Sequence, residues 1–141
     1  MAGAAVISNV PSRLESIFVT ESKNDVGIYA LKFFALGIPV NMVIDDFIPL
    51  TKFDYTLYAN IPADGALWGP ILEKGFAKFH SNYESIESGA TGEAINELIG
   101  SPTIDYWHNK TDKDELWEKV LTQLSKDAMI SSGSFTGTGS D

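Results

Sequence analysis

Hydrophobic and polar residues recur along this chain with two different periods, and each period predicts a different element. From Gly65 to Ile86 the apolar residues recur at spacings of three and four, which predicts one amphipathic helix. Asp64 is expected to cap that helix, and Pro70 lies in its first turns, where a missing backbone N–H is tolerated. From Val26 to Asp46 two runs rich in β-branched and aromatic residues flank a turn at 35–37, which predicts a β-hairpin.

Shorter helices are predicted on both sides of these elements. Residues 2–10 are small and apolar and are interpreted as the end of a buried helix, and a second short helix is predicted over residues 11–18. A further helix is predicted from 91 to 98, with its first residue as the cap and Gly100 as its end. Residues 88–91 are predicted to form the turn between the two central helices.

The rest of the chain gives weaker signals. The spacing of its leucines predicts a helix up to about Lys126, opened by a capping box of Thr111 and Asp114. Three segments are predicted to form short strands, namely residues 57–61, 103–107 and 128–135. The last residues, 134–141, are predicted to form a flexible tail or an interrupted loop.

The composition is that of an ordinary globular protein, and it excludes several classes of function. The 141 residues suffice for one domain or slightly more, with 44% hydrophobic and 21% charged residues. The formal net charge of −9 argues against binding to nucleic acid or to an anionic membrane surface, because both require clustered Lys and Arg. The chain contains no cysteine, which excludes a disulfide, a thiolate metal site and a cysteine nucleophile within these residues.

No membrane or targeting segment is predicted. No apolar run reaches the roughly 18 residues that a membrane span needs. Residues 1–13 have no basic region ahead of their short apolar run, so they make a poor signal peptide.

The candidate catalytic groups are few, and a structural role is favoured for each. Asp45 and Asp46 follow a strand, but adjacent strand residues point to opposite faces. We therefore expect them to cap backbone N–H groups rather than to share a metal ion. His80 and His108 have no nucleophile nearby in the sequence and no G-x-S-x-G elbow exists, so both are interpreted as structural.

The glutamates on the predicted helices are interpreted as solvated faces. Two pairs, Glu73 with Lys78 and Glu115 with Lys119, are expected to contribute only a few tenths of a kcal/mol where they meet. Gly89 lies in the turn between the two central helices, where a second backbone could approach closely. Its local sequence alone favours a simple helix C-cap.

Two stretches of this chain carry a resemblance to a known family. The first is GIYALKFFALGIPVNMVIDDFIP, and its end is similar to a V-D-D-x-x-P pattern. The second is LWGPILEKGFAKFHSNYESIESGATGEAINELIG, which is similar to W-x-x-L-L-E-K-A-Y-A-K followed by Y-E-x-L-x-G-G. The matching residues are Val43, Ile44, Asp45, Asp46, Pro49, Trp68, Leu72, Glu73, Lys74, Phe76, Ala77, Lys78, Tyr83, Glu84, Gly89, Thr91 and Glu93. Together the stretches resemble the protease core of the calpain family.

The resemblance implies an α+β fold and an activity. Residues 1–100 would form most of the mainly helical, papain-like first half of a calpain protease core, with its small antiparallel sheet. Residues 101–141 would be the incomplete beginning of the β-rich second half. Calpains are intracellular, calcium-dependent cysteine endopeptidases, so we expect a cytoplasmic hydrolase whose cleft takes protein or peptide substrates.

The family's catalytic residues are expected to fall outside this chain. The nucleophilic Cys is expected shortly before Met1, and the His beyond the segment Ser134–Asp141. Loss of a nucleophile or base costs on the order of 10⁶ in turnover, so this chain alone is expected to show no proteolysis.

One family role transfers to this chain and another does not. Gly89 matches the family glycine that hydrogen-bonds an extended substrate backbone, and Ser88 and Ala90 flank it on the same rim. Ala66 stands where the family's first-half calcium site has a glutamate. An alanine cannot ligate calcium, and Asp64 is not expected to replace that ligand. No cofactor or metal is therefore expected within this chain.

Two functions stay open on the sequence. The chain is either the cleft wall of a calpain-like endopeptidase or a non-catalytic calpain-like interaction module. In both cases the expected partner is the remainder of its own polypeptide or another protein subunit, because half a core leaves apolar surface and strand edges exposed. A self-contained enzyme of another class would need a nucleophile–base pair that the sequence lacks.

Overall fold

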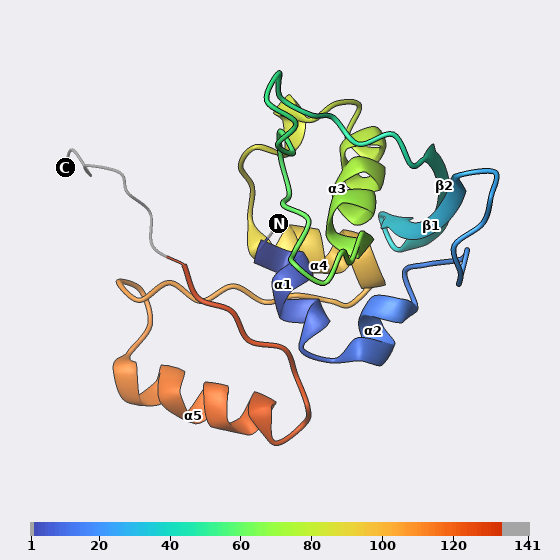
Figure 1. Ribbon diagram of the computed structural model, residues 1–141. Coiled ribbons are helices and arrows are strands. Elements are labelled where there is room, and N and C mark those ends of the chain that lie inside the picture. Colours follow the sequence, from blue (N-terminus) through green and yellow to red (C-terminus); the bar gives the residue numbers. More distant parts are fainter. Residues whose placement is uncertain (1, 134–141) are drawn as a thin grey trace. The chain divides into compact units, whose positions relative to one another are not determined.

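The computed structural model describes residues 2–133, which fall into two compact units, one ending at Thr103 and one beginning at Ile104. The elements of the first unit are α1 (Ala2–Ser8), α2 (Pro11–Glu15), β1 (Ile28–Ala35), β2 (Ile38–Asp45), α3 (Trp68–Phe79), the 3₁₀ turn η1 (Glu84–Ile86) and α4 (Thr91–Ile99) (Figure 1). The second unit contains α5 (Lys113–Leu124). Helices together with one small antiparallel sheet confirm the predicted α+β class.

The predicted hairpin is formed by β1 and β2. Their antiparallel register runs from Ile28 opposite Asp45 to Ala35 opposite Ile38. The connection is a two-residue turn in which φ is 50° at Leu36 and 79° at Gly37. Positive φ at both central residues is the conformation that matches the twist of a tight hairpin. The pairing leaves one face of the sheet apolar and available for the helices.

The core of the first unit lies between the hairpin and the helices α1, α3 and α4. The largest side chains that are fully buried are Ile7, Ile17, Leu31, Phe33 and Leu72. Figure 1 shows α3 lying alongside the hairpin. Gly75 permits this close approach, because a Cβ at that position would collide with Leu31 Cδ1 and come within 3.4 Å of the Phe33 ring.

The central helix is shorter than its apolar spacing predicts. It begins at Trp68 and ends at Phe79 instead of running from 65 to 86. Ser81 has a φ of 82°, a left-handed conformation that no helix interior contains. Tyr83 and Ile86 continue the apolar spacing but belong to the separate turn η1 and its N-cap. Both are half-buried, so the periodicity continues across a break in the backbone.

The caps of the two central helices differ from the prediction. Leu67 precedes α3 without a side-chain hydrogen bond, while Asp64 Oδ1 accepts a hydrogen bond from the N–H of Ala66 at 3.0 Å. Ala90, rather than Thr91, is the N-cap of α4. The predicted end of α4 is confirmed, because Gly100 adopts the left-handed conformation there with φ of 70°.

The helix of the second unit is confirmed, with a different cap. Asp112, not Thr111, opens α5, and its Oδ1 accepts hydrogen bonds from the N–H groups of Asp114 and Glu115. The helix ends at Leu124, two residues before the predicted end at Lys126. The ordinary N-cap role of aspartate explains this start.

The short strands predicted elsewhere do not form in the described part of the chain. Residues 57–61, 103–107 and 128–133 are irregular, and an isolated bridge joins Leu50 to Thr56 instead. Residues 134–141, with the end of the third strand and the predicted tail, lie outside the described residues. None of the described residues from Ile104 onward is buried, so no apolar surface supports a strand there.

The short helix α2 ends at Glu15, earlier than predicted, and the chain then pairs with the hairpin. Phe18 forms a bridge with Leu31, and the N–H of Lys32 donates to the carbonyl of Ile17 at 2.8 Å. This pairing covers part of the outer edge of β1. The assignment of residues 1–100 and 101–141 to the two halves of a protease core stays a prediction.

Candidate functional site

The backbone of Gly89 is open. Gly89 lies between η1 and α4 without regular structure, and no hydrogen bond joins its N–H or C=O to another described residue. A Cβ built at this position would meet no atom within 4 Å. The following residue, Ala90, is extended, with φ of −77° and ψ of 133°. Ser88, Gly89 and Ala90, which we call the rim segment, are all exposed. The N–H and C=O of Gly89 are available to a ligand, whereas the C=O of Ala90 accepts a hydrogen bond from the N–H of Ala94 at 3.2 Å.

The connection that carries the rim segment, residues 80–90, is built by local hydrogen bonds. It leaves α3 at His80 and turns at Ser81, whose φ is positive. Asn82 Oδ1 then accepts hydrogen bonds from both the N–H and the hydroxyl of Ser85, at 2.8 and 2.9 Å. This pattern of an Asn side chain bonding forward to the backbone sets the turn η1. Local hydrogen bonds therefore set the turns of this connection, and contacts from other parts of the first unit add to them.

An ion pair or hydrogen bond closes the base of this connection. His80 Nε2 lies 2.9 Å from Oε2 of Glu97 on α4, and the imidazole packs edge-on against the rings of Phe76 and Phe79. The contact joins the end of α3 to α4, which confirms a structural role for His80. His108 is exposed in the second unit.

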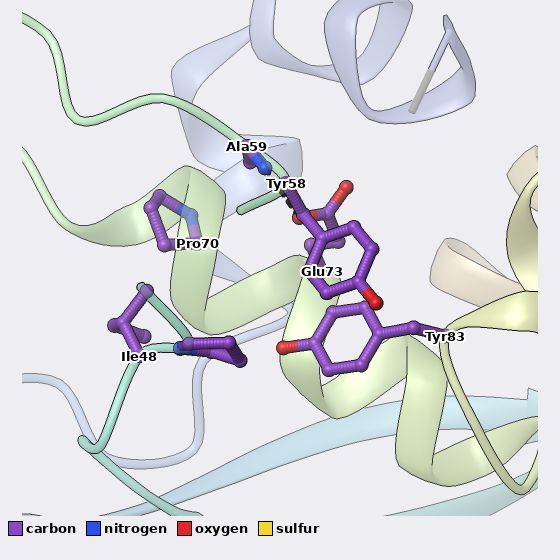
Figure 2. Close-up of a pocket in the computed structure, with 7 residues that line it drawn as sticks. Ile48, Tyr58, Ala59, Pro70, Glu73 and Tyr83 are labelled. Carbon is purple, nitrogen blue, oxygen red and sulfur yellow. Dashed lines mark hydrogen bonds between the residues drawn. The ribbon is translucent and has the colours of Figure 1, made fainter. Parts of the chain in front are cut away.

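A pair of tyrosines holds the middle of the connection. The rings of Tyr58 and Tyr83 stack with centroids 4.1 Å apart and an interplanar angle of 3°. Figure 2 shows the two rings face to face, with Glu73 of α3 behind them. Burial, followed by the negative charge of Glu73, raises the pKa of Tyr83 to about 12. Tyr83 therefore stays neutral at any ordinary pH and contacts Tyr58 as an uncharged ring.

The apolar side chain of Ile86 anchors the end of η1. Ile86 lines a cavity of about 30 Å³ together with Ala4, Leu72, Phe76, Ala94 and Leu98. The cavity lining is apolar, so it offers no polar group to orient a ligand. The N–H of Glu87 still bonds to the carbonyl of Glu84, and the carbonyl of Ala90 bonds to the N–H of Ala94. Gly89 therefore lies between two fixed points.

Asp45 caps the backbone at the end of the hairpin, as predicted. Its Oδ1 accepts hydrogen bonds from the N–H of Phe47 at 2.9 Å and from Lys74 Nζ at 2.5 Å. The ammonium of Lys74, followed by the Phe47 N–H, lowers the pKa of Asp45. Asp46 lies against Gly27, where a Cβ would come within 2.7 Å of its carboxylate. The two aspartates therefore have different neighbours.

Of the two predicted ion pairs, one is formed. Lys119 Nζ lies 2.6 Å from Glu115 Oε1 on α5. The pairing of Glu73 with Lys78 is wrong. Glu73 instead accepts a hydrogen bond from the N–H of Ala59 at 2.7 Å, and Lys78 donates to the carbonyl of Val43 at 2.7 Å. Both groups on α3 therefore tie down neighbouring backbone, which their spacing alone does not reveal.

Ala66 and Asp64 lie close together ahead of α3, and the absence of a calcium site there stays a prediction. Ala66 offers a methyl group, and its N–H engages one carboxylate oxygen of Asp64, the nearest acidic residue in the sequence. Within residues 2–133, no group of three or more His, Cys, Asp or Glu residues lies close enough together to hold a metal ion. None of the helices in that range is long and apolar enough to cross a membrane.

Sequence reasoning singled out the rim segment but missed the residues that position it. Tyr83 entered as an apolar position of the central helix and as part of a motif, and Tyr58 was given no role of its own. Glu97 was interpreted as part of a solvated face, whereas it is part-buried against His80. These contacts join residues that are distant in the sequence: His80 and Glu97 are 17 residues apart, and Glu73 and Ala59 are 14 apart. The Asn82 to Ser85 spacing is the one local signal that could have located the break in the helix.

Known proteins are similar to this chain in sequence. Residues 1–140 match the family model described as calpain family cysteine protease. A calpain-type cysteine protease of Zea mays is 31% identical over 98% of this chain, and calpain-B of Drosophila melanogaster is 36% identical over 77% of it. The calpain-1 catalytic subunit of Mus musculus is 30% identical over 74% of the chain.

These relatives are much longer than the present sequence. The chain spans 7% of the length of the maize protein, 12% of the fly protein and 14% of the mouse subunit. The match to the family model nevertheless extends over nearly every residue, and it includes both stretches that resemble the family motifs. This chain belongs to the calpain family of cysteine proteases.

Proposed function

We propose that this chain forms a wall of the substrate cleft in a cytoplasmic, calpain-like cysteine endopeptidase, where Gly89 binds the backbone of the substrate. The observation that carries the proposal is the open N–H and C=O of Gly89 next to an extended residue. A peptide in extended form can pair with such groups as an added strand does. Recognition of this kind depends on main-chain groups and tolerates many sequences, as an endopeptidase requires.

The small neighbours of Gly89 suit this role. Ser88 and Ala90 carry short side chains and are exposed, so a second backbone could approach the rim segment closely. Gly89 itself is not held in a left-handed conformation, because positive φ values among the described glycines occur at 27, 37, 65 and 100. Its lack of a side chain therefore serves close approach rather than a strained turn.

The chemistry of peptide cleavage is assigned to residues outside this chain. The sequence contains no cysteine, so the nucleophile comes from the remainder of its polypeptide or from another subunit. The isolated 141-residue chain is accordingly expected to bind peptides without cleaving them. Calcium, if the intact enzyme uses it, is held by residues other than Ala66 and Asp64.

The substitution Gly89→Ala tests this function. Space for a methyl group exists and the backbone conformation is an ordinary one, so the fold should be kept. The methyl group would stand in the path of a second backbone. We expect it to weaken binding of a capped, uncharged hexapeptide rich in Val and Thr by roughly five- to tenfold, equivalent to about one lost hydrogen bond.

A matched control and a contrary result complete this test. Gly69→Ala also adds a methyl group where no atom lies within 4 Å, but on α3, and should leave the dissociation constant unchanged. Titration calorimetry or peptide fluorescence gives the affinities. Equal affinity of the wild type and Gly89→Ala would show that the peptide binds elsewhere.

A further inference from the structure

The connection between α3 and the rim segment makes an aromatic contact with the loop that precedes α3. Tyr83 is the N-cap of η1, six residues before Gly89, and its ring lies parallel to that of Tyr58 at 4.1 Å. Tyr58 comes from the loop that precedes α3, so the contact joins two irregular segments of the first unit. Stacked rings of this kind restrict both partners beyond what simple burial achieves.

The partner ring is itself attached to a rigid element. The N–H of Ala59, next to Tyr58, donates to Glu73 Oε2 at 2.7 Å, and Glu73 lies on α3. A hydrogen bond with a charged acceptor is stronger than one between neutral groups. Pro70, Ile48 and Pro49 line the same depression around the rings (Figure 2). The contacts therefore run from α3 through Glu73 to Tyr58 and from there to Tyr83.

Few other contacts fix the connection between α3 and α4. His80 with Glu97 closes its base, and Ile86 enters the core at its far end. Beyond Ile86 no hydrogen bond holds Gly89 to the described part of the chain. The direction in which the rim segment leaves η1 therefore depends on the position of η1. The contact between Tyr58 and Tyr83 fixes the N-cap residue of that turn.

We propose that Tyr58 and Tyr83 act together as positioning residues that hold the backbone of Gly89 ready for an extended peptide. The proposal rests on the proposed function, because it explains how that same rim segment is ordered. A segment that is ordered before binding loses less conformational freedom when the peptide arrives, and this raises affinity without a new contact. Neither tyrosine needs to touch the peptide.

The test compares three variants of the full 141-residue chain. Tyr58→Ala removes the stacked ring, and Tyr58→Phe keeps the ring and removes only the hydroxyl. Tyr55→Ala removes an aromatic ring from the same loop, 73% exposed, and serves as the matched control. Two quantities are measured for each variant: the ¹⁵N order parameter of the Gly89 amide without peptide, and the dissociation constant of the capped hexapeptide used above.

The expected results separate a positioning role from a general loss of structure. Tyr58→Ala should lower the Gly89 order parameter to about 0.6 or less, and weaken peptide binding by roughly two- to tenfold. Tyr58→Phe and Tyr55→Ala should match the wild type in both quantities. If Tyr58→Ala does not fold, the same two quantities are measured for Tyr83→Phe and Tyr83→Leu. Tyr83→Phe should match the wild type, and Tyr83→Leu should show the lower order parameter and the weaker binding.

Failure of this inference differs from failure of the proposed function. If the wild type binds the peptide and removal of the ring changes neither the affinity nor the order parameter, the tyrosines have no positioning role and the inference is overturned. If the wild type binds no peptide, the proposed function fails, and the order parameter alone decides: a lower value on loss of the ring supports the positioning of Gly89, and an unchanged value overturns it.

Discussion

Burial and the nearby carboxylate of Glu73 raise the pKa of Tyr83 to about 12, above its ordinary value of 10.0. The unfolded chain therefore releases the phenol proton at a lower pH than the folded chain does. Stability from this residue is complete below pH 10 and is lost as the pH rises towards 12. We expect the free energy of unfolding to fall between about pH 10 and pH 12, measured by urea denaturation.

The substitution Tyr83→Phe isolates this contribution. It keeps the stacked ring but has no ionisable group, so its loss of stability over the same pH range should be smaller than that of the wild type. Other groups titrate in both proteins and cancel in the comparison. An identical alkaline loss in the two proteins would mean that Tyr83 is not the responsible group.

Single-residue roles were predictable where the cause is local. Gly100 at the end of α4 and Asp45 beside the hairpin act through backbone groups a few residues away. Tyr83 and Glu73 contact Tyr58 and Ala59, which lie far away in the sequence in an irregular loop. Hydrophobic periodicity does not predict the path of such a loop. Ser81 has a left-handed backbone conformation that its residue type does not predict, because Gly or Asn usually occupies such a position.

At the scale of elements, the packing of α3 on the hairpin depends on a missing side chain. A methyl group at Gly75 would collide with the buried side chain of Leu31 and crowd the Phe33 ring. Gly75→Ala is therefore expected to destabilise the protein by about 1–3 kcal/mol, reduced somewhat by the better helix propensity of alanine. Chemical denaturation measures the change.

Gly69→Ala is the matched comparison on the same helix. A methyl group there meets no atom within 4 Å, so only the helix propensity acts. This variant should be as stable as the wild type or more stable, by up to about 1 kcal/mol. If both alanine variants were equally stable, the close contact between α3 and β1 would not be a packing constraint.

Whole elements were predictable where pattern and turn chemistry agree. The hairpin combines strand-forming residues with a turn that ends in glycine, and it formed with the expected strands. The short strands predicted at 57–61 and 103–107 lack a neighbouring strand, and sequence alone does not say whether a partner exists. The central helix was predicted too long because apolar residues beyond Phe79 also face the core.

At the scale of the molecule, this chain matches its family over nearly its whole length but spans only a small part of its relatives. It spans 7% of the maize relative and 14% of the mouse calpain-1 catalytic subunit, yet the family match covers residues 1–140. The family could be identified from the sequence because its motifs are concentrated between Gly27 and Gly100. The candidate site could be located in the same way, but the open backbone of Gly89 and the stacking of Tyr58 on Tyr83 became visible only in the structure.

The most direct test of the central claim is a titration of the ¹⁵N-labelled chain with the capped hexapeptide, followed amide by amide. The account predicts the largest shift changes at Ser88, Gly89 and Ala90, with a downfield shift of the Gly89 amide proton as it donates a hydrogen bond to the peptide. Changes confined to other segments, such as the outer edge of β2, with the Gly89 amide unmoved at saturation, would contradict the assignment of Gly89 as the residue that binds substrate backbone.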